Sequence, residues 1–184
     1  MMKKILATID NSPRNQAVLE TAISLAQATG AKLMLLHILS EADVDYPILP
    51  TYVYYAVLKG KDDTVFHRTF DEYERREEEF LRDLARKAIA AGVDTEYTQL
   101  SGIPGETICE IASNWSADLI LVGSRGLKGM KEMFIGSVSN YVTHHAPCSV
   151  LIVRTDTDSV SYTINFPSEE SAEADSVQKV CDRN

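Results

Sequence analysis

The segment from Asp118 to Arg154 constrains the fold more than any other part of the chain. An apolar strand pattern, Leu119 to Val122, runs directly into Gly123-Ser124-Arg125-Gly126. Nine residues later, Gly136-Ser137 opens a helical pattern, and a last apolar run ends at Val153. Glycine follows a strand where the backbone turns sharply or approaches something closely, and a helix start offers free amides to an anion. The pattern predicts a nucleotide cradle in an α/β domain.

The composition is typical of a globular protein with one buried core. The chain has 184 residues, 45% of them hydrophobic, which is enough for one full domain. Its net charge of −9 argues against nucleic acid as a main partner. Residues 155–184 hold seven acidic and two basic residues and little apolar content. We therefore expect a domain over 1–154 and an acidic, disordered tail over 155–184.

The three cysteines, Cys109, Cys148 and Cys181, are widely spaced and do not describe a disulfide framework. Cys109 and Cys148 lie in apolar patterns, which is typical of small core residues rather than reactive thiols. The first apolar run is interrupted at Asp10, too early for a signal peptide. No apolar stretch approaches the ~20 residues that cross a bilayer. These features predict a cytoplasmic protein with no membrane partner.

Apolar runs and helical patterns alternate along the chain. The expected strands are Ile5 to Ile9, Lys32 to Leu39, Val93 to Leu100, Leu119 to Val122 and Cys148 to Val153. The expected helices are Pro13 to Thr29, Asp71 to Ala91, Pro104 to Asn114 and Gly136 to His145. Right-handed crossovers then produce one parallel sheet with helices on both faces. Ligands bind such sheets where the strand order reverses, and we expect Asp10 and Gly123 to be neighbours there.

Residues 41–70 form a long connection without a clear period, and it is either functional or mobile. Its tyrosines are packing residues or, over Tyr52 to Tyr55, a lid on a bound ligand. The helix that follows carries a charged run, Glu72 to Glu79, which indicates a solvated face. Its helical spacing aligns Tyr73, Glu77, Phe80, Leu84 and Ala88.

Each part of the glycine pattern also has a simpler explanation. Gly123 and Gly126 alone describe a tight turn, Gly136-Ser137 a helix start capped by serine, and Asp10 an acid at a helix N-terminus. Their convergence on one sheet edge favours a ligand site. The loop cations either meet phosphate oxygens or remain solvated: Arg125, Lys128 and Lys131. The adjacent His144 and His145 point to different helix faces, so we expect no joint metal site.

The motif is neither a Walker A loop nor Gly-x-Gly-x-x-Gly. Its spacing is Gly-x2-Gly-x9-Gly-Ser, and Gly126 is also followed by Gly129. With the flanking Ile9-Asp10-Asn11-Ser12, the strand Leu35 to Ile38 and the closing His145 to Val153, it resembles the ATP-binding members of the universal stress protein family. The resemblance covers residues 3–154.

This resemblance implies a flavodoxin-like, adenine-nucleotide alpha-hydrolase-like sheet of strand order 3-2-1-4-5 that binds ATP or AMP. Beside the adenine and ribose it would place Thr8, Ile9 and Asp10, with Ile38 over the base. Around the ribose and phosphates it would place Gly123, Ser124, Arg125, Gly126 and Gly129. At the phosphates it would place Gly136, Ser137, Val138 and Ser139. Mg²⁺ or Mn²⁺ would accompany a triphosphate, held largely by phosphate oxygens and water.

The last strand, Cys148 to Val153, is apolar without alternation and is expected at the sheet edge. Such an edge invites pairing, and isologous pairing of two copies gives the homodimer that the resemblance also implies. Coverage by the tail or by residues 41–70 is the alternative.

Three functions fit these patterns. The favoured one is a nucleotide-responsive stress or signalling module with an unknown protein partner. The second is a weak ATPase or a nucleotidyl-transfer enzyme, which needs a placed base, whereas Asp10 is the only acid predicted at the site. The third is a nucleotide-free structural dimer in which the glycines only shape the turn.

Overall fold

The computed structural model describes residues 2–12, 14–41, 43, 46–47, 64–124 and 135–154. Strands and helices alternate in them as the sequence predicted. In chain order they are β1 (Lys4–Thr8), α1 (Asn15–Thr29), β2 (Lys32–Leu39), α3 (Thr64–Ala90), β3 (Thr95–Ser101), α4 (Pro104–Trp115), β4 (Leu119–Gly123), α5 (Ser137–His145) and β5 (Ser149–Val153).

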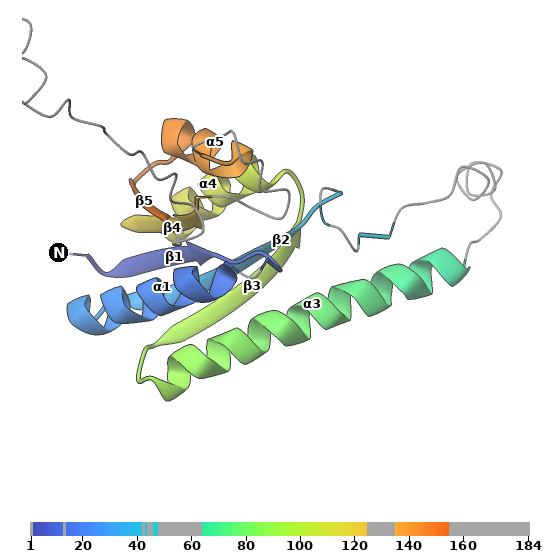
Figure 1. Cartoon of the computed structure of the whole chain (residues 1–184), viewed down its shortest axis with the longest axis horizontal. Coiled ribbons are helices and arrows are strands. Elements are labelled where there is room, and N and C mark those ends of the chain that lie inside the picture. Colours follow the sequence, from blue (N-terminus) through green and yellow to red (C-terminus); the bar gives the residue numbers. More distant parts are fainter. Residues whose placement is uncertain are drawn as a thin grey trace, which may run out of the picture.

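The strands form one parallel sheet in the order β3-β2-β1-β4-β5, which confirms the predicted fold class. Helices α1 and α3 cover one face of the sheet, and α4 and α5 cover the other (Figure 1). Strand order reverses at β1, which pairs with β2 on one side and with β4 on the other. Ala7 lies opposite Leu121, so the same register brings Ile9 level with Gly123.

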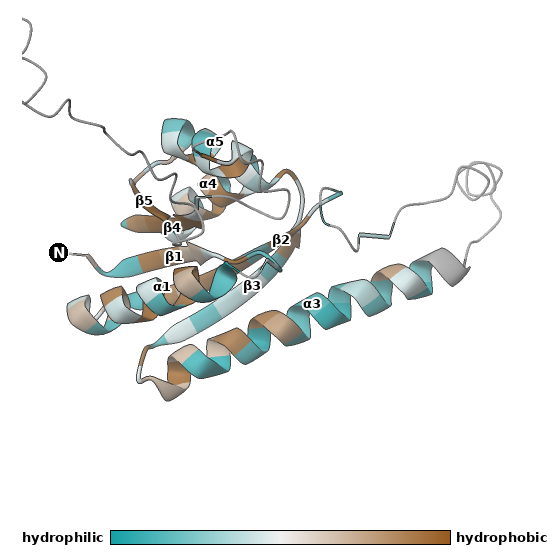
Figure 2. Ribbon diagram, viewed as in Figure 1, coloured by the Kyte–Doolittle hydropathy of each residue, from teal (hydrophilic) through white to brown (hydrophobic). Residues whose placement is uncertain are grey.

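The core has two layers, one on each face of the sheet. The strands between these layers, such as β1 and β4, are largely hydrophobic (Figure 2). In β1, Ile5 and Ala7 pack toward α1 and α3, while Leu6 packs toward α4 and α5. None of the three has any exposed surface. This explains the continuous apolar run of β1, because a parallel strand covered on both faces has no polar side.

Helix α1 begins at Asn15, later than the Pro13 that the sequence predicted as first helical position, and Pro13 itself lies outside the described residues. The delay comes from a turn built by two side chains. The carboxylate of Asp10 accepts hydrogen bonds from both the amide and the hydroxyl of Ser12, at 3.2 and 2.6 Å. The Ser12 carbonyl then accepts a 3.1 Å hydrogen bond from the amide of Asn15, the first residue of the helix.

Helix α3 begins at Thr64 rather than at Asp71, so the end of the predicted 41–70 connection is helical. Its first turns extend past the sheet (Figure 1). Aromatic contacts accompany this extension: the Tyr46 ring lies 5.9 Å from Phe70 and 5.7 Å from Tyr73. The lid considered for Tyr52 to Tyr55 lies outside the described residues.

The predicted solvated face of α3 is wrong at one position, Glu77. This side chain is buried, with 3% of its surface exposed. Two cysteines behave as the sequence predicted: Cys109 and Cys148 are free, half-buried and packed against the core layer of α4 and α5. Burial raises the pKa of both thiols, which makes them less reactive.

The contact between α4 and α5 depends on the missing side chain of Gly105. A Cβ added there would lie 2.7 Å from Cδ1 and 2.8 Å from Cγ of Tyr141 on α5. Those ring atoms lie close to the backbone and move little without moving the helix. The glycine therefore sets how closely α5, which begins at the glycine–serine motif, packs against α4.

We expect Gly105→Ala to destabilise the fold by about 1–3 kcal/mol, because the added methyl overpacks the α4–α5 contact. Urea unfolding of wild-type and variant protein measures this difference. In a Tyr141→Ala background the clash is absent, and alanine is then the better helix former by up to about 1 kcal/mol. The same loss in both backgrounds would contradict the overpacking explanation.

Candidate functional site

The candidate site lies at the carboxyl ends of the neighbouring strands β1 and β4, where the strand order reverses. Thr8 ends β1, and its hydroxyl donates a 3.2 Å hydrogen bond to the carbonyl oxygen of Leu121 in β4. Gly123 ends β4. The two strand ends, far apart in sequence, are therefore joined by a side chain as well as by the sheet.

The turn after β1 is rigidly held. Ile9 is buried, and its amide donates a 2.8 Å hydrogen bond to the carbonyl oxygen of Leu36 in β2. Asp10 is half-buried, and its Oδ1 accepts both bonds from Ser12. One carboxylate oxygen of Asp10 thus shapes the turn, and Asp10 does not cap α1, whose N-cap residue is Arg14.

The turn after β4 is tied to the start of α5. The Ser124 carbonyl accepts a 2.7 Å hydrogen bond from the Gly136 amide, and the Ser124 amide donates to Val153 in β5. The hydroxyl of Ser139 donates a 2.5 Å hydrogen bond to the Gly123 carbonyl. These bonds bring together the two glycine segments of the motif, as the sequence predicted.

The first turn of α5 offers backbone amides. Gly136 is the N-cap residue in extended conformation, and no side chain of the described residues caps this helix end. The Asn140 amide makes the first intrahelical hydrogen bond, to the Gly136 carbonyl. The amides of residues 137–139 come before it and have no acceptor within the helix. These amides carry the positive end of the helix dipole, which favours an anion. Ser137 is exposed there, whereas Ser139 is buried.

The remaining predicted residues divide into two groups. Ile38 lies near the end of β2, and Val138 lies in α5; both pack in the core layer of α4 and α5, so they share one side of the sheet. The loop residues Arg125, Gly126 and Gly129 lie outside the described residues, together with Lys128 and Lys131. Their contacts with a ligand stay predictions.

Two buried polar residues beside the site were not predicted as functional. His37 in β2 is 2% exposed, and its Nδ1 lies 2.7 Å from the carbonyl oxygen of Ile9. Its Nε2 faces the buried Glu77 of α3 at 3.6 Å. The signal was present in the sequence, because His37 interrupts an apolar strand and Glu77 falls on the helical stripe that includes Leu84.

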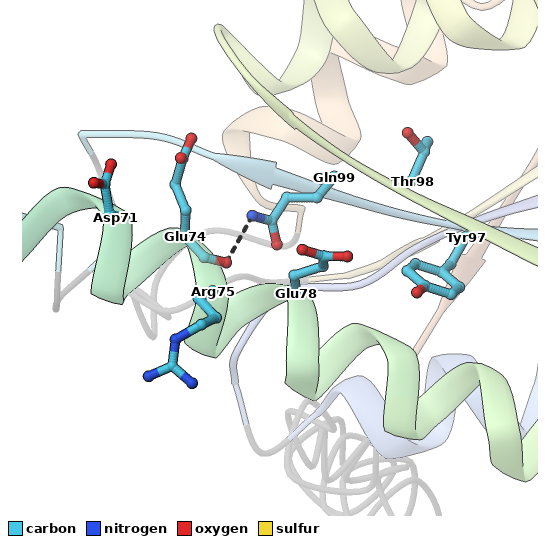
Figure 3. A pocket seen from close by; sticks show the side chains of 7 residues that line it. All are labelled: Asp71, Glu74, Arg75, Glu78, Tyr97, Thr98 and Gln99. Carbon is cyan, nitrogen blue, oxygen red and sulfur yellow. Dashed lines mark hydrogen bonds between the residues drawn. The ribbon is translucent and has the colours of Figure 1, made fainter.

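An open groove of about 540 Å³ lies elsewhere, between α3 and the edge strand β3 (Figure 3). Carboxylates from Asp71, Glu74 and Glu78 line it, and Gln99 donates a hydrogen bond to the Glu74 carbonyl. None of the predicted site residues that the structure describes lines this groove. Its acidic lining is unfavourable for a phosphate.

Within the described residues no group of three or more His, Cys, Asp or Glu side chains is arranged to hold a metal ion. His145 instead stacks on Tyr141 with ring centroids 4.0 Å apart. A search of the described helices finds none that is both long and apolar enough to span a membrane.

Fold and site together define an α/β protein with a glycine-rich turn at the strand-order reversal. The family model described as "Universal stress protein family" matches residues 1–154. Among similar proteins, universal stress protein Sll1388 of Synechocystis sp. is 36% identical over 151 residues, covering 82% of this chain and 97% of that protein. Universal stress protein YxiE of Bacillus subtilis is 34% identical over 154 residues, covering 84% of this chain and 100% of that protein. The chain belongs to the universal stress protein family.

Solved structures share the fold. The universal stress protein UspA of Lactobacillus plantarum superposes with a TM-score of 0.67 at 24% identity, covering 83% of this chain and 98% of that one. A universal stress protein in complex with cAMP superposes with a TM-score of 0.54 at 24% identity, covering 83% of this chain and 97% of that one. The universal stress protein from Archaeoglobus fulgidus in complex with dAMP superposes with a TM-score of 0.53 at 19% identity, covering 83% of this chain and 98% of that one.

We expect Ser139→Ala to lower the free energy of unfolding by about 1–3 kcal/mol, because it removes the donor to the Gly123 carbonyl inside the fold. Ser137→Ala is the matched control: this exposed serine is on the same helix turn, and we expect a change within about 0.5 kcal/mol. Denaturant unfolding without nucleotide measures both. Equal effects of the two substitutions would contradict the assignment of the Ser139 hydroxyl to the fold.

Proposed function

We propose that this universal stress protein is a cytoplasmic, nucleotide-responsive stress or signalling module that binds an adenine nucleotide, ATP or AMP, at the β1–β4 edge. The observation that carries the proposal is the start of α5, which no side chain of the described residues caps and which is tied through Ser124 to the end of β4 and so to β1. Amides at a helix N-terminus bind phosphate. The cAMP and dAMP complexes of proteins with this fold support an adenine nucleotide as the ligand.

In this proposal the nucleotide lies across the edge from β2 to α5. The adenine and ribose contact Thr8, Ile9 and Asp10, and Ile38 covers the base. The loop residues Gly123, Ser124, Arg125, Gly126 and Gly129 enclose the ribose and phosphates. The amides of Ser137, Val138 and Ser139 and the exposed Ser137 hydroxyl bind the phosphates, while Gly136, whose amide donates to the Ser124 carbonyl, holds the start of the helix beside them.

Mg²⁺ or Mn²⁺ fits this site only as a companion of a triphosphate. Divalent hard cations prefer oxygen ligands, and Asp10 is the sole carboxylate among the proposed site residues. Its Oδ1 already accepts two hydrogen bonds from Ser12. The cation would therefore be held by phosphate oxygens and water.

Binding is favoured over turnover for the same reason. Phosphoryl transfer needs a residue that orients the attacking water and groups that stabilise the transferred phosphate. Asp10 is the sole carboxylate proposed at the site, and one of its two oxygens is already bonded to Ser12. A weak ATPase or nucleotidyl-transfer enzyme remains the second candidate, and turnover above ~1 per minute would favour it.

We further propose a homodimer through β5, the counterpart of the predicted Cys148–Val153 strand. The strand is at the sheet edge, and Leu151 on it is 37% exposed. An apolar edge strand with unpaired backbone groups favours pairing with a second copy. The unknown protein partner would bind the nucleotide-bound and the nucleotide-free dimer with different affinities.

Thermal unfolding with ATP, ADP, AMP and cyclic AMP tests the binding site. We expect a bound nucleotide at 100 times its dissociation constant to stabilise the wild-type fold by about 2.7 kcal/mol. Ser137→Asp should abolish this stabilisation, because its carboxylate occupies the phosphate position at the helix N-terminus. The same charge favours the helix dipole, so the nucleotide-free protein should keep its stability.

Ser137→Asn is the matched control, because asparagine has the size of aspartate without its charge. This variant should retain most of the stabilisation by the nucleotide. No stabilisation of the wild-type protein by any of the four nucleotides would refute the proposed function. It would favour the nucleotide-free structural dimer.

For the dimer, we expect Leu151→Lys to shift the protein from dimer to monomer at micromolar concentration, because the charge repels its symmetry mate across the β5 edge. Sedimentation velocity measures the change. Ile89→Lys, at an exposed apolar position of α3 away from β5, is the control and should remain dimeric. A monomeric wild-type protein would rule out the proposed interface.

A further inference from the structure

A buried histidine–glutamate pair lies directly behind the proposed nucleotide site. Side-chain exposure is 2% for His37 and 3% for Glu77. His37 comes from β2 and Glu77 from α3, and the proposed site residues include neither of them. Buried polar side chains are unfavourable unless they are paired, so this pair calls for an explanation.

The hydrogen bond from His37 to the turn determines which ring atom faces Glu77. A backbone carbonyl only accepts, so Nδ1 of His37 carries the proton of the 2.7 Å bond to the Ile9 carbonyl. Nε2 therefore faces Oε2 of Glu77 across 3.6 Å, and neither atom has a hydrogen-bond partner among the described residues. The two buried atoms therefore face each other across a gap that is longer than a hydrogen bond.

The other carboxylate oxygen of Glu77 reaches the same turn. Its Oε1 accepts hydrogen bonds from Nδ2 of Asn11 at 3.4 Å and from Nε of Arg76 at 3.2 Å. One side chain of α3 thus touches Asn11 directly and Ile9 through His37. These two residues flank Asp10, the residue proposed to meet the ribose.

We propose that His37 and Glu77 are positioning residues of the nucleotide site, which hold the Ile9 carbonyl and Asn11 so that Asp10 projects toward the ligand. The inference rests on the proposed function. It also means that α3 and the nucleotide are coupled, because the turn that binds the ligand is anchored to this helix. A ligand that fixes the turn then also favours the docked position of α3.

Docking of α3 does not itself require this pair. The helix packs on the sheet through Leu81, Leu84 and Ala88, all in the core layer of α1 and α3. Buried ion pairs are weak contributors to stability, and apolar residues of similar volume often replace them without loss. The pair is better explained by the geometry that it imposes on the turn.

The test compares Glu77→Leu, Glu77→Gln and Leu84→Ala. For each we would measure unfolding in denaturant, the ATP dissociation constant by calorimetry, and hydrogen exchange of the Asn11 and Ser12 amides without nucleotide. Leu84→Ala removes a core contact of the same helix and leaves the pair intact. It therefore controls for the effect of lower stability alone.

We expect Glu77→Leu to weaken ATP binding about tenfold, the effect of one charged hydrogen bond, and to speed exchange at Asn11 and Ser12. Leu84→Ala should lower stability with ATP binding unchanged within twofold. Glu77→Gln should restore binding, because its amide donates to Nε2 of His37 and its carbonyl still accepts from Asn11.

If Glu77→Leu and Leu84→Ala weaken ATP binding in proportion to their loss of stability, the pair is structural and the inference is overturned. If wild-type protein binds no nucleotide, the proposed function fails, and amide exchange decides on positioning. Unchanged exchange at Asn11 and Ser12 in Glu77→Leu would then overturn the inference, and faster exchange would support it.

Discussion

The pairing of β1 with β4 is the constraint on which the rest of the molecule depends. Ile5 to Ala7 lie opposite Leu119 to Leu121, more than a hundred residues further along the chain. Closing so long a loop is entropically unfavourable, and burial of both strands on both faces offsets it. Without this pairing the turn after β1 would not lie beside Gly123. The amides at the start of α5 would then face solvent alone.

The strands were predictable from local patterns, whereas their order, 3-2-1-4-5, came from the resemblance to the universal stress protein family. A continuous apolar run such as β1 identifies a covered parallel strand without knowledge of its neighbours. The starts of α1 and α3 were less accurate, because contacts made by residues outside the helical patterns accompany them. Asp10 and Ser12 delay α1, and contacts of Tyr46 with Phe70 accompany the early start of α3.

Glu77 shows why the burial of a charge is hard to predict from sequence. It belongs both to a charged run and to an apolar stripe, and only the partner across the interface decides between them. His37, inside an otherwise apolar strand, is that partner. A polar residue in one buried pattern therefore indicates a polar partner in another, and the two patterns must be considered together to predict the buried pair.

The resemblance to the family assigns both serines of the motif, Ser137 and Ser139, to the phosphates, whereas the helix geometry gives their hydroxyls different roles. Ser137 and Ser139 are two positions apart, which is about 200° around a helix with 3.6 residues per turn. Ser139 therefore turns inward and donates to the Gly123 carbonyl, while Ser137 stays exposed at the amide-rich end. The inner serine fixes the distance between the strand end and the helix. The outer serine and its neighbouring amides then lie together at the start of α5, which is the arrangement that the proposed phosphate site requires.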